Sequence, residues 1–331
     1  VYVSTDFGPG SMTTSGYARI VKEWKRGTSM SDAKVIFEGE NDDMMVGAGR
    51  NHQAGYERDY VYRLKTFYTN ELYIRKDDGS LVKVNAPDSA NKSVMRDLLV
   101  LELREDLTAN GQTYVKGSTI AANLDDYLAG KIEYSVIFQP DERSSLVGLG
   151  STKDYFYINV LEDVKNRIYL VTPGKGVWER TPLPNMPEFG TVGVTAIDDE
   201  TSNEFFMTLT DYVTPTSLFI GEIGGGKPEL LKQLPAFFDA TPYEISQNFV
   251  ESKDGTRVPY FMIARKDLKL DGTNPTLLYG YGGFEISLTP SYNASVGLAW
   301  LDQGGVYVVG NIRGGGEYGP RWHQAALKEN R

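Results

Sequence analysis

The sequence predicts a mainly β protein in two parts: a series of repeated strand units, then the start of a mixed α/β sheet. Three observations lead to this fold class. Strand–turn–strand patterns fill the first three quarters of the 331 residues, with little helical periodicity. These patterns recur at a regular spacing. Near the end, two apolar runs break into glycines and flank one helical pattern. We therefore expect domains at residues 1–245 and 246–331.

The repeated part contains strong hairpin signals, such as the turn at Asp77, Asp78 and Gly79 between two alternating apolar runs. Equivalent points of the repeat are separated by 51, 96 and 50 residues, and they are Val21, Leu72, Ile168 and Leu218. The middle gap is close to two periods, so a further unit is expected near residues 119–120.

A repeat of about 40–50 residues with four strands is typical of a β-propeller blade. The sequence therefore predicts a partial propeller of about five blades, with the first incomplete and the third weakest. Unrelated hairpins in a β-sandwich are the alternative. An open set of blades exposes the faces of its first and last members. Missing blades upstream, or a partner that covers the ends, are therefore expected.

The second part begins near residue 246, where the repeated strand units end. A strand that follows a helix and runs into glycines is typical of a parallel sheet. The expected elements are strands at 247–251 and 258–265, a strand at 276–281, a helix within 290–302, a strand at 306–312 and a helix at 320–331. The strands at 276–281 and 306–312 are expected to be buried on both faces, because both are continuous apolar runs.

Composition limits the function classes. The net charge of −10 argues against a nucleic-acid partner, because phosphate binding requires a basic surface. No apolar run is long enough to span a bilayer, so no membrane partner is expected. The chain has no cysteine, which excludes disulfides, thiolate metal sites and a cysteine nucleophile. These properties do not distinguish a cytoplasmic from a periplasmic location.

Each apolar run of the second part ends in a glycine loop, and the glycines are Gly280, Gly282 and Gly283 after the first and Gly314, Gly315 and Gly316 after the second. Such loops bring backbone N–H groups to the carboxyl edge of a sheet, where α/β proteins bind ligands. The second loop also matches G-x-G-x-x-G, but the acidic ribose partner would fall beyond residue 331. A structural turn is the favoured interpretation, with Arg313 and Glu317 as an ion pair or hydrogen-bond anchor.

The first glycine loop is the better candidate for chemistry, because it contains Tyr281. A phenol O–H at the carboxyl edge of a sheet can point into a cleft and stabilise a developing oxyanion. Metal binding has little support, since the Asp-Asp pairs of the chain lack the spacing of a calcium loop. No cofactor is expected.

Several motifs resemble the prolyl oligopeptidase family of serine peptidases. They are Y-G-Y-G-G-F at 279–284, I-S-L-T-P-S-Y at 286–292, N-I-R-G-G-G-E-Y-G at 311–319 and W-H at 322–323. The specific resemblance covers residues 247–331, and the repeats fit in architecture. It implies a seven-bladed propeller capping an α/β-hydrolase domain. It also implies that Tyr281 is the oxyanion-hole donor, that Phe284 lines the substrate cleft near the proline pocket, and that His323 is structural.

A serine hydrolase of this fold needs a nucleophile on a G-x-S-x-G elbow, followed by its acid and its histidine. The sequence contains no such elbow, and its only histidines are His52 and His323. By the resemblance, the whole triad lies beyond residue 331. The chain begins without methionine, as if inside a strand. We therefore expect a chain truncated at both ends and inactive by itself.

The expected function of the complete protein is hydrolysis of short proline-containing peptides after proline, by an acyl-enzyme mechanism. Two alternatives remain open. One is a non-catalytic propeller that serves as a binding or scaffold module. The other is a related peptidase of different residue preference, or a peptide cyclase on the same framework.

Overall fold

The computed structural model describes residues 1–330, without the side chain of Glu329, and its contacts divide the chain into two compact units after Ile137. The division lies well before residue 246, where the repeated strand units of the sequence end. The domain boundary at 245/246 stays a prediction.

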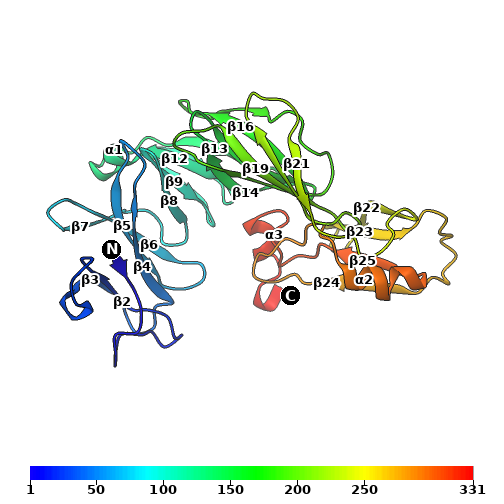
Figure 1. Cartoon of the computed structure of the whole chain (residues 1–331), viewed down its shortest axis with the longest axis horizontal. Helices are drawn as coiled ribbons and strands as arrows, with labels where there is room; N and C mark the ends of the chain where they lie inside the picture. The colour runs from blue at the N-terminus through cyan, green and yellow to red at the C-terminus, as the bar shows by residue number, and fades with distance from the viewer. Residues whose placement is uncertain (331) are drawn as a thin grey trace. The chain divides into compact units, whose positions relative to one another are not determined.

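The first unit contains one three-stranded sheet and two four-stranded antiparallel sheets (Figure 1). The three-stranded sheet has the order β1 (Tyr2–Val3), β2 (Ile20–Glu23), β3 (Lys34–Glu38), with the short helix η1 (Met30–Asp32) before β3. The next sheet has the order β4 (Met45–Asn51), β5 (Arg58–Leu64), β6 (Asn70–Arg75), β7 (Leu81–Lys83). The third has the order β8 (Asn91–Met95), β9 (Leu98–Glu102), β12 (Thr119–Asn123), β13 (Ser135–Phe138). The first unit contains all of this sheet except Phe138, the last residue of β13.

The third sheet is interrupted between its second and third strands. A separate hairpin, β10 (Leu107–Ala109) with β11 (Gln112–Tyr114), is inserted there, and helix α1 (Leu124–Leu128) precedes the last strand. This insertion explains why the third repeat is the weakest in the sequence. The side chains between this sheet and β4–β7 form one apolar core, which includes Leu72, Leu99 and Ile120.

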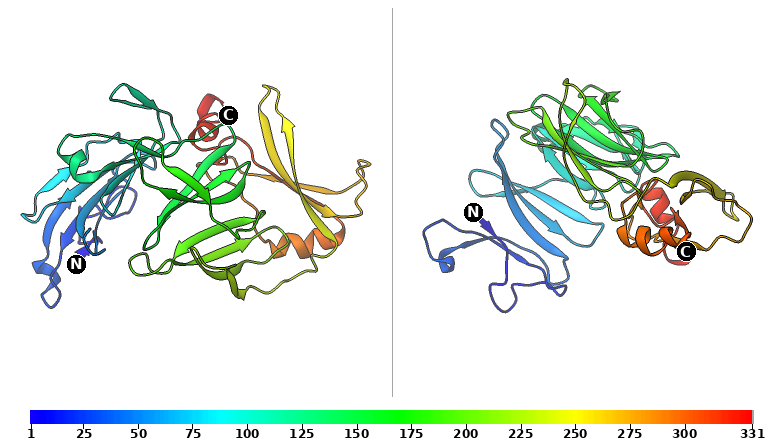
Figure 2. Two further views of the ribbon diagram at one scale, coloured as in Figure 1. Left: turned by 90° about the horizontal axis from the view of Figure 1, so that it is seen from above. Right: turned by 45° about the vertical axis from the view of Figure 1, so that its right-hand side comes forward.

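The second unit begins with two further four-stranded antiparallel sheets, which Figure 2 draws in green to yellow-green. The first is β14 (Ser144–Ser151), β15 (Phe156–Glu162), β16 (Lys165–Thr172), β17 (Glu179–Pro182). The second is β18 (Thr191–Ala196), β19 (Glu204–Thr210), β20 (Ser217–Glu222), β21 (Glu229–Gln233). A core that includes Ile168, Val192 and Phe205 joins them.

The predicted repeat is confirmed by these sheets. Leu72, Ile168 and Leu218 each lie in the third strand of a four-stranded sheet, and residues 119–120 begin the third strand of the remaining one. Val21 lies in the middle strand of the three-stranded sheet, which is the incomplete first repeat. The predicted mainly β fold with five blade-type sheets is therefore correct.

The second unit ends in a mixed sheet with the order β22 (Tyr243–Glu251), β23 (Arg257–Arg265), β25 (Val306–Gly310), β24 (Thr276–Gly280). Strands β24 and β25 are parallel, and between them run α2 (Ala294–Ala299) and η2 (Leu301–Gln303). Gly304, at φ 84°, ends η2. The predicted strand–helix–strand unit is thus present. Helix α3 (Pro320–Gln324) and η3 (Lys328–Asn330) follow, so the predicted helix at 320–331 is shorter than expected; Arg331 lies outside the described residues.

One prediction about this sheet is wrong. Strand β25 is buried as expected, but all five residues of β24 are exposed, and Leu278 is 72% exposed. The reason is its position in the sheet. Strand β24 has β25 on one side, and no other described strand pairs with its second edge. An apolar run indicates a strand that has a partner to bury it, and the run alone does not say which residues provide that partner.

The two blade-type sheets of the second unit share a core with the mixed sheet, which positions the candidate site. Val164, at the β15–β16 turn, and Tyr212, after β19, are buried together with Phe261 of β23 and Tyr307 of β25. Burial of large apolar and aromatic side chains is the main favourable term in such packing. The mixed sheet is therefore held against the blades by a continuous apolar contact.

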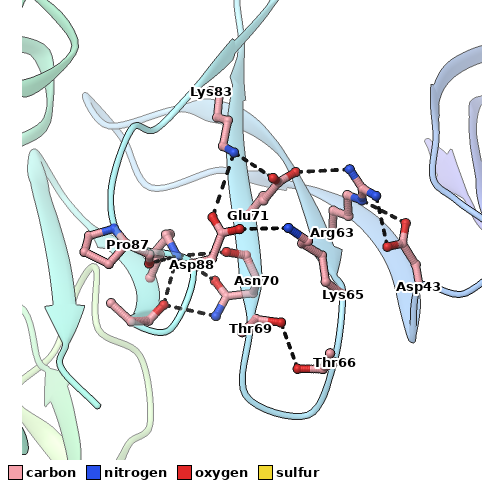
Figure 3. Close-up of polar contacts among 12 residues, drawn as sticks. Asp43, Arg63, Lys65, Thr66, Thr69, Asn70, Glu71, Lys83, Pro87 and Asp88 are labelled. Carbon is pink, nitrogen blue, oxygen red and sulfur yellow. Dashed lines mark hydrogen bonds and ion pairs between the residues drawn. The ribbon is translucent and has the colours of Figure 1, made fainter. Parts of the chain in front are cut away.

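A chain of alternating charges ties the strands of the β4–β7 sheet to the loops beside it (Figure 3). Arg63 of β5 pairs with Asp43 at 2.8 Å and with Glu71 of β6 at 3.4 Å. Lys83 of β7 pairs with the other oxygen of Glu71 at 2.6 Å. Burial raises the pKa of Glu71, but hydrogen bonds from Lys83 and Tyr73 outweigh it and lower this pKa to about 2.

Substitution Arg63→Ala is expected to destabilise the first unit by about 2–4 kcal/mol, because it leaves two buried carboxylates without their shared cation. The side chains of Asp43 and Glu71 are only 3% and 7% exposed. The measurement is the midpoint of urea denaturation followed by circular dichroism. Lys65→Ala is the control, since its pair with Asp88 is solvent-exposed and should contribute little. Equal effects of the two substitutions would contradict this account.

Candidate active site

The loop after β24 presents Tyr281 at the carboxyl end of a parallel strand, where the sequence placed it. The Tyr281 side chain is 40% exposed, and no residue in the described part of the chain holds its hydroxyl by a hydrogen bond. The phenol O–H is thus free to donate to a group outside this chain. The assignment of Tyr281 as an oxyanion donor stays a prediction.

The backbone of this loop is strained. Phe284 and Glu285 have φ values of 51° and 61°, in the left-handed region that only glycine enters without cost. Each such residue costs about 1–2 kcal/mol, and it persists only where its surroundings hold it. Gly282, at φ 60°, provides the same conformation without a Cβ atom. Strained residues of this kind gather at functional sites, which supports the choice of this loop.

Backbone and side-chain contacts from the second glycine loop hold the strained segment in place. The Glu285 N–H donates to the Gly314 carbonyl oxygen at 3.2 Å. The His323 ring nitrogen Nδ1 lies 2.8 Å from that same oxygen. The Ile286 N–H donates to the Gly283 oxygen at 3.0 Å, which closes the turn within the loop. His323 is buried here against backbone, in keeping with the structural role that the resemblance implied.

Glycine is required at this crossing because the two loops approach through their backbones. A Cβ atom at position 314 would overlap the Gly282 oxygen, and one at position 316 would overlap the Glu285 oxygen. A Cβ at position 282 would lie 2.6 Å from the Arg313 oxygen. Gly315 makes room in the same way for the carboxyl group of Glu317.

The other two glycines of the Tyr281 loop, Gly280 and Gly283, have more room. A Cβ at Gly280 would lie 3.4 Å from the Gly310 oxygen of β25, and one at Gly283 would lie 3.3 Å from the Tyr281 ring. Gly283 thus allows the Tyr281 ring to lie close to its own backbone. A structural role for these glycines in the loops is still a prediction, and these contacts give it a physical basis.

Arg313 and Glu317 do not pair with each other. The Arg313 guanidinium pairs with Asp254, in the β22–β23 turn, and the Asp254 pKa is lowered mainly by that hydrogen bond. The Glu317 side chain, 1% exposed, accepts hydrogen bonds from the Leu288 N–H at 2.9 Å and from Asn311 Nδ2 at 3.1 Å. Of the two alternatives from the sequence, the ion pair is therefore wrong and the hydrogen-bond anchor is correct. Burial raises the pKa of Glu317.

The blade-type sheet β14–β17 contacts the same turn from its other side. Ser145 Oγ, on β14, donates to the Glu317 carbonyl oxygen at 2.9 Å. The Tyr318 hydroxyl donates to Asp163 at the β15–β16 turn, at 3.1 Å. The sequence gave no signal for Ser145, which is more than 170 residues from its partner. Asn311 was part of a recognised motif, but its contacts depend on the folded loop.

Phe284 lies in the strained segment and is 62% exposed. Its role in lining a proline pocket is a prediction.

Within the described residues, no three histidine, cysteine or acidic side chains come together as a metal site. No helix in that part of the chain is long and apolar enough to cross a membrane. A phenol O–H in this position is able to donate a hydrogen bond to a carbonyl oxygen, and the role of Tyr281 in such a contact stays a prediction.

No family model matches the chain, but individual known proteins do, and they are peptidases. The "Uncharacterized peptidase y4nA" of Sinorhizobium fredii is 39% identical over 340 residues, which cover 100% of this chain and 47% of that protein. A "Prolyl endopeptidase" of Elizabethkingia miricola is 36% identical over 190 residues, covering 57% of this chain and 26% of its own length. The solved structure of a post-proline cleaving enzyme from Rickettsia typhi matches with a TM-score of 0.89 at 27% identity. That match covers 100% of this chain and 49% of the enzyme.

The names of these relatives are those of peptidases, and the matches to the Sinorhizobium fredii protein and the Rickettsia typhi structure extend over the whole of this chain. The relatives and solved structures that this chain matches are peptidases of the prolyl oligopeptidase family, the family that its motifs resemble. The chain spans about half the length of the curated relatives that match it over nearly all of its residues.

Substitution Gly314→Ala is expected to destabilise the second unit more than Gly304→Ala. Both positions have positive φ, 99° and 84°, so each alanine costs about 1–2 kcal/mol of backbone strain. Only the Gly314 position also meets backbone, which adds about 1–3 kcal/mol of overpacking. The measurement is the urea-denaturation midpoint of each variant. Equal destabilisation would show that close approach of the loops does not determine the glycine.

Proposed function

We propose that the whole protein containing this chain is a serine-type oligopeptidase that cleaves short peptides on the carboxyl side of proline. The names of the relatives support this proposal, because they include a prolyl endopeptidase and a post-proline cleaving enzyme. The observation that carries it is the Tyr281 loop, where an exposed phenol follows a parallel strand on a strained, firmly held backbone.

In the proposed reaction, a serine activated by a histidine and an aspartate attacks the carbonyl carbon of the proline residue. The C–N bond breaks after the leaving amine receives a proton from the histidine, and water then releases the acyl group. Residues outside this chain provide this triad. Tyr281 donates its O–H to the negative oxygen of the tetrahedral intermediate, together with a backbone N–H.

Phe284 is proposed to line the substrate cleft beside the proline ring. Its exposed aromatic face suits contact with an apolar ring. The blade-type sheets are proposed to restrict access, so that short peptides are the substrates. Proline-containing peptides are therefore the expected partners, and neither a cofactor nor a metal takes part.

Substitution Tyr281→Phe in the complete protein is expected to lower kcat by about 10²–10³-fold and to change KM little, because the lost hydrogen bond forms only in the transition state. The measurement is hydrolysis of a chromogenic Gly-Pro substrate. Tyr279→Phe is the matched control, since this exposed tyrosine lies on β24 two residues earlier. If both variants kept wild-type kcat, Tyr281 would not be the donor.

The 331-residue chain by itself is expected to release no product from the same substrate. Hydrolysis above the buffer rate that a serine-directed inhibitor abolishes would contradict this expectation. The complete reading frame distinguishes the remaining alternatives. A frame without a serine elbow would favour the scaffold function, and an intact elbow with another residue preference would favour a related peptidase or a cyclase.

A further inference from the structure

Two buried side chains fasten the end of the Tyr281 loop at Leu288. The Leu288 N–H donates to Glu317 Oε1 at 2.9 Å, and the Leu288 carbonyl oxygen accepts from Asn311 Nδ2 at 2.7 Å. Asn311 Nδ2 also donates to the same Glu317 oxygen at 3.1 Å. Both backbone polar groups of one loop residue are thus bound to side chains that follow β25.

This pair of side chains is completely enclosed. Asn311 and Glu317 are 0% and 1% exposed, and no lysine, arginine or histidine of the described residues pairs with the carboxyl group. Burial raises the Glu317 pKa, which favours the neutral acid. Tyr212 is a titratable neighbour, and burial also raises its pKa. An acid without a cation partner is an unusual choice for the interior, because burying it costs free energy that only its hydrogen bonds offset.

The turn that carries Glu317 is itself fixed from the opposite side. Ser145 of β14 donates to the Glu317 carbonyl oxygen, and the Tyr318 hydroxyl donates to Asp163. The turn that carries Glu317 is therefore held by contacts that do not involve the Tyr281 loop.

We propose that Glu317, together with Asn311, is a positioning residue that holds residues 281–288 in the strained conformation from which Tyr281 donates to the oxyanion. The inference rests on the proposed function. The segment is anchored at one end by β24 and at the other by Leu288, and the strained residues Phe284 and Glu285 lie between. The Leu288 anchor acts together with the contacts of Glu285 and Ile286 to oppose relaxation of that strain.

The hydrogen bonds distinguish two substitutions of Glu317. Glutamine keeps an acceptor oxygen at the same distance along the side chain, so Glu317→Gln should retain both bonds. Alanine removes the acceptor, so the buried Leu288 N–H loses its partner and the Asn311 amide keeps only its bond to the Leu288 carbonyl oxygen. A comparison of these variants therefore separates the positioning role from a requirement for negative charge.

The first measurement is amide hydrogen exchange of residues 285–288 in the complete protein. We expect Glu317→Ala to accelerate exchange in this segment about tenfold, while Glu317→Gln stays within twofold of wild type. Glu71→Ala, which removes a buried carboxyl group of the first unit, is the control and should leave this segment unchanged. Unchanged exchange in Glu317→Ala would overturn the proposal.

The second measurement is the hydrolysis of the chromogenic Gly-Pro substrate. Glu317→Ala should lower kcat about tenfold with KM within twofold, and Glu317→Gln should restore kcat. Equal losses of kcat in the alanine and glutamine variants would overturn a positioning role. If Glu317→Ala does not fold, Asn311→Ala replaces it, because it frees the Leu288 carbonyl oxygen and should also accelerate exchange.

The two readouts separate the two hypotheses. If the complete wild-type protein hydrolyses no proline substrate, the proposed function fails, while the exchange data still decide whether Glu317 holds the loop. If the protein is active and Glu317→Ala is as active as wild type despite faster exchange, only the positioning role fails.

Discussion

The close approach of two backbone loops, at the carboxyl ends of β24 and β25, is the constraint on which the candidate site depends. The loops meet at Gly282 and Gly314, where no Cβ atom fits. Contact at this distance lets the Gly314 oxygen accept the Glu285 N–H, which holds the strained backbone beside Tyr281. The free-energy cost of this strain is thus offset locally, and in the described part of the chain the Tyr281 phenol has no hydrogen-bond partner.

The same crossing connects parts of the chain that are distant in sequence. Ser145, on a blade-type sheet, binds the turn at Glu317, and Glu317 binds the loop at Leu288. The shared core of Val164 and Phe261 supports these polar contacts with apolar packing. The blades of the second unit therefore do more than adjoin the mixed sheet, because their side chains take part in fixing the loop that carries the candidate donor.

The glycines of this site and its buried polar side chains have different structural roles. The glycines remove side chains where backbones must touch, as at Gly316 beside the Glu285 oxygen. Glu317 and Asn311 then satisfy the backbone groups that the turn leaves without partners. Buried polar groups are stable only when hydrogen-bonded, so each of these residues depends on the others.

The sequence alone determined the repeat, the strand–helix–strand unit and the position of Tyr281, because strand periodicity, turn residues and glycine loops are local properties of the chain. Leu72 and Ile168, for example, lie in the third strands that their spacing predicted. The tertiary structure decided which side chains are exposed and which residues distant in sequence are in contact, and the spacing of residues along the chain does not determine either. It left Leu278 exposed on an edge strand, directed Arg313 to Asp254, and brought Ser145 to Glu317. Such contacts depend on which elements pack together, and a single sequence contains no local signal for that choice.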